Sequence, residues 1–178
     1  MKFNSNRNIY IKRLIFAVLF VITAVLQHTK GVIPVIGSAH AMLLIPLTVS
    51  VAMFEQSIAS LLFGAFAGFL WDMASINADG YFAFVLALTG FTVALLMNFV
   101  MRNNFRCACL MSVAFSFICN FGYWFIFILI KGYDSPLYFL RSYYLPSSVY
   151  TAVLIPIYYF LIYGITMLLK PKKERVNY

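Results

Sequence analysis

The sequence predicts an all-α integral membrane protein with six transmembrane helices, and three observations lead to this prediction. Of its 178 residues, 63% are apolar and only 10% are charged, whereas soluble domains average about 45–50% apolar and 25% charged residues. The apolar residues form stretches close to the roughly 20 residues that a helix needs to cross a bilayer. The basic residues behind the net charge of +8 lie at the ends of these stretches, where they orient membrane proteins rather than bind nucleic acid.

The chain is expected to form one polytopic membrane domain over its full length. The six expected spans are residues 9–27, 39–54, 57–74, 81–101, 107–130 and 149–169. The first has full length only if Lys12 and Arg13 extend their charged groups to the surface. The second is expected to start as a loop or broken segment and to become helical at about Ala39, because Pro34 and Pro46 interrupt its backbone hydrogen bonds.

The connections between spans carry their own signals. Glu55 begins a tight turn into the third span, and Gly80 is expected to supply a positive φ in the loop before the fourth. Residues 137–144 are expected to form a short amphipathic helix on the membrane, ended by Pro146. Pro156 is expected to bend the last span.

The distribution of lysine and arginine predicts the orientation. With six spans, the N-terminus, the 55–56 turn, the 102–106 loop and the C-terminus share one side, and most of the 13 basic residues lie there. The positive-inside rule then places both termini in the cytoplasm. Asp72, roughly 24 Å along a helix from the 55–56 turn, is placed near the outer surface.

The third span carries a stripe of small residues that ends in a carboxylate. Ser60, Gly64 and Gly68 are spaced four apart, which puts them on one helix face, and Asp72 continues that face. Small residues at this spacing let membrane helices approach closely. The fourth span is expected to present a small-residue face too. Its members are Ala83, Ala87, Gly90 and Ala94.

Asp72 has three possible roles. In the first, it is a carboxylate at the membrane edge, solvated or paired with Lys30, Lys131 or Arg141. In the second, it is a fixed polar group in an outward-facing pocket or partner site. In the third, it belongs to a proton relay. A pocket at that end would be lined by Trp71, Asp72, Tyr123 and Trp124.

Reactive motifs are not found in the sequence. It has no G-x-S-x-G, no H-E-x-x-H, no phosphate-binding glycine loop and no C-x-x-C pair. His28 and His40 are 12 residues apart, a spacing without helical logic for a shared metal. We therefore expect no catalytic residues, no metal site and no cofactor.

The segment from Gly64 to Ser75, GAFAGFLWDMAS, followed by GYFAF from Gly80, resembles the signature of the MreD family. In that pattern a glycine-bearing helix ends in G-x-hydrophobic-x-D, and a glycine after a short loop opens the next helix. Gly68, Asp72 and Gly80 fall on these positions.

The resemblance implies a non-catalytic scaffold subunit of the bacterial cell-elongation (rod) complex, or elongasome, in the inner membrane. Such a subunit supports cell shape and lateral peptidoglycan synthesis. It implies as partners an MreC-type periplasmic protein, the MreB filament, a RodA-type polymerase and its transpeptidase. Ser60, Gly64, Gly68, Asp72 and Gly80 are then the expected helix-packing or partner-binding residues.

The family's fold is similar to that of the substrate-binding (S) subunits of energy-coupling-factor transporters. This likeness gives an alternative function, a small-molecule binding subunit of such a transporter. Those subunits usually dock their membrane partner through A-x-x-x-A on the first helix. Here Ala17 is followed by Val21, and Ala24 by His28, so that pattern is missing.

Overall fold

The structure, a computed structural model, describes residues 3–29, 41–75, 80–99, 105–129, 141–142 and 145–169, and every element labelled within them is a helix. In chain order the elements are α1 (Phe3–His28), α2 (Leu44–Ala52), α3 (Ser57–Ala74), α4 (Tyr81–Phe99), α5 (Phe105–Trp124), the π-helix η1 (Phe125–Leu129) and α7 (Leu145–Leu169). The predicted all-α class is confirmed for this part of the chain.

Five helical segments in the described residues are long and apolar enough to cross a membrane. They comprise most of α1, all of α3, α4 and α7, and α5 together with most of η1. Large apolar side chains point outward along these helices, and Ile58 and Leu168 are about three-quarters exposed. Apolar surface of this extent on a soluble protein would be a liability, whereas lipid covers it in a multi-pass membrane protein.

The short helix α2 lies at the centre of the fold. All nine of its residues are buried, and it contacts α1, α3, α4, α5 and α7. At roughly 14 Å it is too short to span a bilayer alone. The expected helix over 39–54 is therefore wrong in its length. Pro46 lies in the first turn of α2, where a missing N–H costs little.

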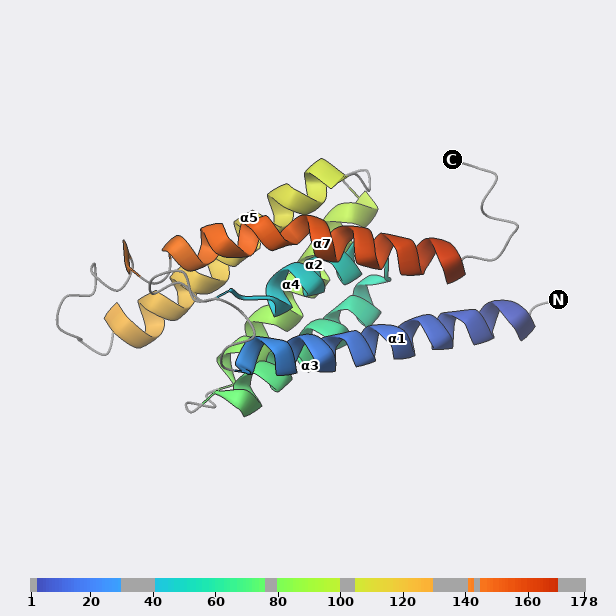
Figure 1. The fold of residues 1–178 in the computed structure, drawn as a ribbon, viewed down its shortest axis with the longest axis horizontal. Coiled ribbons are helices and arrows are strands. Elements are labelled where there is room, and N and C mark those ends of the chain that lie inside the picture. The colour runs from blue at the N-terminus through green and yellow to red at the C-terminus, as the bar shows by residue number, and fades with distance from the viewer. Residues whose placement is uncertain are drawn as a thin grey trace.

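Successive helices run in opposite directions, with α1 beginning and α7 ending at the same end of the bundle (Figure 1). We call this the terminal end. Lys12 of α1 meets Glu55 of the α2–α3 turn there. At the opposite end, which we call the Asp72 end, the ring of His28 lies edge-on to that of Trp71. The start of α1 and the end of α7 thus share a side of the bundle.

Several helix boundaries differ from those expected. α1 begins at Phe3, six residues before the expected span, and its first turns project beyond the other helices (Figure 1). α7 begins at Leu145, so Pro146 lies in the first turn of the last helix instead of ending an earlier one. Pro156 lies inside α7. Lys30, His40, Lys131 and most of residues 137–144 lie outside the described residues.

The main core joins α1, α2, α3, α4, α5 and α7. Phe16 and Phe20 of α1 are fully buried and pack on the ring of Phe63 in α3, with ring centroids 6.1 and 5.9 Å apart. Leu86 of α4 and Ile162 of α7 complete this cluster. Apolar burial thus holds α3 against α1 on one side, which leaves its glycine face for α4.

Candidate functional site

The two glycines of α3 lie directly against the backbone of α4. A Cβ added to Gly64 would overlap the carbonyl of Leu86, and one added to Gly68 would overlap the carbonyl of Phe82. The relation is reciprocal further along, because a Cβ on Gly90 of α4 would overlap the carbonyl oxygen of Ser60. Only hydrogen fits at these positions, which lets the two backbones approach closely.

Asp72 continues this face and caps α4. Its Oδ1 accepts a hydrogen bond from the N–H of Phe82 at 3.3 Å, and its Oδ2 accepts one from the N–H of Ala83 at 2.9 Å. Both N–H groups belong to the first turn of α4, which has no partner for them within the helix. The carboxylate also lies at the positive end of the helix dipole. Asp72 of α3 thus acts as an N-cap for α4.

This geometry revises the expected roles of Asp72. The residue is only 6% exposed, so the interpretation as a solvated carboxylate is wrong. Among the described residues its hydrogen-bond partners are backbone N–H groups, and no ion pair joins it to Arg141. Lys30 and Lys131, its other expected partners, lie outside them.

Gly80 makes the cap possible. Its φ is +70°, as expected, and its carbonyl oxygen accepts the first hydrogen bond of α4, from the N–H of Phe84 at 3.2 Å. The chain can therefore enter α4 at an angle that turns the first N–H groups toward Asp72. Residues other than glycine and asparagine rarely adopt this conformation.

Gly80 offers a test of conformation separate from space, because a Cβ there would meet no atom within 4 Å. We expect Gly80→Val to destabilise the protein by about 1–2 kcal/mol through backbone strain alone. Gly80→Asn should cost about half as much, because asparagine tolerates the left-handed region. Thermal unfolding in detergent measures both. Equal stability of the two variants would contradict a conformational role for this glycine.

Aromatic rings stack beside the cap. Trp71 stacks on Phe82 at 4.2 Å, Phe82 on Tyr123 at 5.4 Å, and Tyr123 on Phe127 at 4.6 Å. The hydroxyl of Tyr81 donates to the carbonyl oxygen of Cys119 at 3.0 Å. The stack joins α3, α4, α5 and η1 at the Asp72 end, so aromatic contacts connect the capped start of α4 to the other three elements.

The expected outer pocket is assembled differently from the prediction. Trp71 and Tyr123 do come together, but the ring of Phe82 fills the space between them. Trp124 is buried and pairs instead with Phe121, at 5.4 Å. These aromatic rings cover one another's faces, so this part of the Asp72 end is a closely packed cluster of side chains. Within the described residues no three His, Cys, Asp or Glu side chains gather as metal ligands would.

A buried ion pair at the terminal end was not anticipated. Glu55, 4% exposed, lies 2.5 Å from Lys12 Nζ and 3.5 Å from the Nε of Arg13. Lys12 and Arg13, which are expected to extend to the surface, therefore meet an acid at that end of the bundle. Asp72 is thus one of two buried carboxylates in the described residues, and the two lie at opposite ends of α3. Their separation gives no support to a proton relay between them.

We expect Glu55→Gln to destabilise the protein by about 1–2 kcal/mol. Breaking a fully buried pair costs about 3–5 kcal/mol, but Lys12 and Arg13 are 16% and 38% exposed and can turn to solvent. The double variant Glu55→Gln with Lys12→Gln should recover part of the loss, as thermal unfolding would show. If the double variant is less stable than the sum of the two single changes predicts, the ion pair is not what Glu55 contributes.

A second small-residue stripe, on α5, was also missed. Ala108, Ser112, Ser116 and Asn120 are spaced four apart and all are buried. The Nδ2 of Asn120 donates to the hydroxyl of Ser148 in α7 at 2.8 Å. The same i, i+4 spacing that identified the α3 stripe was present here in the sequence. This stripe lets α5 pack closely on α7 and α2.

Comparison of the chain with models of protein families, with curated proteins and with solved structures finds no match.

Proposed function

We propose that the chain is a non-catalytic membrane scaffold subunit of the bacterial cell-elongation complex. One observation supports this most. Gly68, Asp72 and Gly80, the three residues that carry the MreD-like pattern, meet at the first turn of α4. Gly68 lies against its backbone, Asp72 accepts its free N–H groups, and Gly80 sets its entry angle. Because all three residues act at the start of α4, the packing of that helix on α3 accounts for the spacing of the motif.

The close packing of α3 on the start of α4 suits a scaffold. It fixes α3 and α4 as a rigid pair and uses small residues and a carboxylate on the inner face to do so. The outer faces of both helices then remain available, and they carry Ile58, Phe69, Phe84 and Leu88, each more than half exposed. A rigid pair with exposed apolar faces is suited to present helix surfaces to partner helices. The proposed partners are the MreC-type periplasmic protein and, through the complex, the MreB filament, the RodA-type polymerase and its transpeptidase.

In the proposed topology the chain crosses the bacterial inner membrane six times, with α2 and the residues beside it as the second crossing. Both termini then lie in the cytoplasm. The alternating direction of the helices (Figure 1) and the contact of Lys12 with the turn at Glu55 support this arrangement. The excess of basic residues at the terminal end supports the cytoplasmic side for it.

Cysteine labelling tests the topology. In a version without its native cysteines, single cysteines at Asn77 and Ser135 should react with a membrane-impermeant reagent added to whole cells. Cysteines at Asn103 and Asn177 should react only after the membrane is opened. Labelling of Asn103 from outside would contradict the six-crossing topology, because this loop would then lie on the same side as Asn77.

Depletion of the chain in its rod-shaped host tests the function itself. We expect cells to become round, and expression of the wild-type chain or of Gly80→Asn to restore the rods. Gly68→Leu should fail to restore them. Normal shape after depletion, together with lost uptake of a vitamin-like compound that raises the melting temperature of the purified protein, would replace the scaffold proposal by the transporter alternative.

A further inference from the structure

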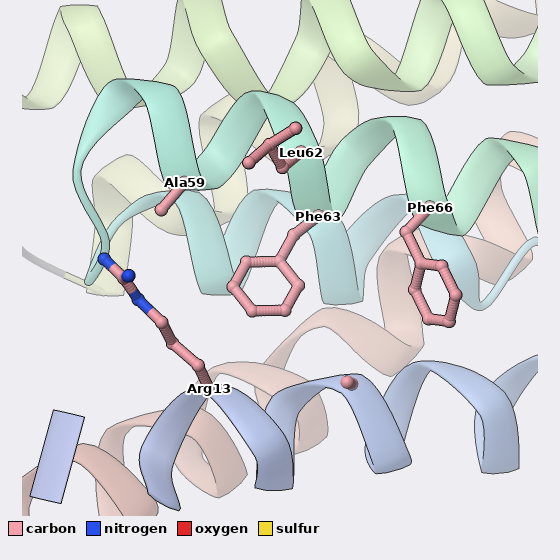
Figure 2. Close-up of a pocket in the computed structure, with 6 residues that line it drawn as sticks. Arg13, Ala59, Leu62, Phe63 and Phe66 are labelled. Atoms are coloured by element: carbon pink, nitrogen blue, oxygen red, sulfur yellow. The ribbon is translucent and has the colours of Figure 1, made fainter. Parts of the chain in front are cut away.

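An apolar groove runs between α1 and α3 on the outside of the bundle, near the terminal end. Its lining consists of Arg13, Ala17, Ala59, Leu62, Phe63 and Phe66, and its volume is about 240 Å³. Figure 2 shows the rings of Phe63 and Phe66 pointing from α3 toward α1, while Arg13 extends from α1 toward the turn that precedes α3. The groove is open to the surroundings, since Leu62 is 64% exposed. It therefore faces lipid in a membrane-embedded bundle.

The mouth of the groove carries unbalanced positive charge. Lys12 and Arg13 face one carboxylate, that of Glu55. Lys12 takes the shorter contact with it and also donates to the carbonyl oxygen of Phe54 at 3.4 Å. Within the described residues, Arg13 has only the 3.5 Å contact of its Nε, and this nitrogen is buried without a hydrogen bond. Because the Arg13 side chain is 38% exposed, the rest of its guanidinium is open to a further anion, and its planar donors match a phosphate.

We propose that this groove is a binding site for an anionic phospholipid of the leaflet at the terminal end. The phosphate lies against Arg13, and one acyl chain lies along Ala17, Phe63 and Phe66. This inference rests on the membrane location in the proposed function, but not on the rod complex. Basic residues between membrane helices on the cytoplasmic side bind anionic headgroups for the same electrostatic reason.

The charge at the mouth of the groove favours a phospholipid over a partner helix. A partner helix is about 10 Å across and carries no fixed anion for Arg13. A single acyl chain is thinner and flexible enough to pass between Ala17 and Ala59. A phospholipid occupies both parts of the site, because its acyl chain contacts the apolar groove and its phosphate contacts Arg13.

Native mass spectrometry of the purified full chain tests this proposal. The protein in mild detergent receives an equal mixture of dioleoyl phosphatidylglycerol and dioleoyl phosphatidylcholine. We expect wild type to retain the glycerol lipid in preference to the choline lipid, and Arg13→Gln to reduce that preference about tenfold. The matched control is Arg106→Gln, which removes an exposed basic residue at the start of α5 and should leave the preference unchanged. An equal loss in both variants would show general electrostatic attraction and overturn the proposal.

A second pair of variants tests the chain site independently of charge and of Glu55. Ala17→Leu fills the groove and should abolish retention of either lipid there, whereas Val18→Leu, on the neighbouring exposed residue, should not. A photoreactive side chain at Leu62, activated in intact cells, should yield lipid adducts. Adducts to a protein instead would assign the groove to a partner helix, and unchanged retention by Ala17→Leu would also overturn the lipid site.

Discussion

Replacing Gly68 by leucine is expected to prevent the chain from folding. The new side chain would overlap the backbone of Phe82 and Ala83, and backbone cannot move aside as a flexible side chain can. Overpacking a core costs about 1–3 kcal/mol when side chains adjust. Here α4 must separate from α3, which also pulls the N–H groups of Phe82 and Ala83 away from Asp72. We therefore expect a loss above about 3 kcal/mol.

The yield of monodisperse protein and its melting temperature in detergent measure this effect. Gly164→Leu is the matched control, because a Cβ at this helical glycine of α7 meets no atom within 4 Å. Gly64→Leu should behave like Gly68→Leu, since its Cβ would overlap the carbonyl of Leu86. Equal tolerance of leucine at Gly68 and Gly164 would mean that the stripe does not hold α3 against α4.

The replacement of Asp72 by leucine should have the second-largest effect, a loss of about 2–4 kcal/mol. It removes a helix cap, which costs about 1 kcal/mol, and it leaves one buried and one part-buried N–H group without partners. Asp72→Asn should lose less, about 1–2 kcal/mol, because the amide oxygen still accepts one hydrogen bond. Its NH₂ group cannot accept the other, and the favourable charge at the helix N-terminus is lost.

Reversible unfolding in lipid–detergent mixtures distinguishes these variants, with Leu88→Ala as a control at an exposed residue of the same helix pair. The expected order of stability is wild type and control, then Asp72→Asn, then Asp72→Leu. An Asp72→Asn variant as stable as wild type would show that one hydrogen bond suffices and that the charge contributes nothing. A stable Asp72→Leu variant would exclude the capping role altogether.

The local features of the site could be predicted from the sequence. Residues four apart share a helix face whatever the fold, so the stripe from Ser60 to Asp72 identified the inner face of α3 correctly. The positive φ at Gly80 followed from a glycine that closes a polar loop between two apolar stretches. The bounds of α3 also agree with the expected 57–74, because a charged turn and a polar loop enclose it.

Features that depend on distant parts of the chain could not be predicted. The sequence suggests charged side chains as partners of Asp72, whereas its partners are the backbone N–H groups of Phe82 and Ala83, and backbone N–H groups occur in every sequence. The local sequence around Glu55 indicates only a turn, because its partners Lys12 and Arg13 precede it by more than 40 positions. The helix α2 is surrounded by five neighbours, and hydropathy cannot separate a buried core helix from a span of similar composition.

Co-purification from the native host tests the scaffold proposal most directly. The tagged chain, extracted in mild detergent under conditions that keep complexes intact, should bring with it an MreC-type periplasmic protein, identified by mass spectrometry. Gly68→Leu should lose that protein, whereas Gly164→Leu should retain it. Recovery of a coupling ATPase and its membrane partner, with no MreC-type protein in the wild-type sample, would contradict the proposed function and identify the chain as a transporter subunit.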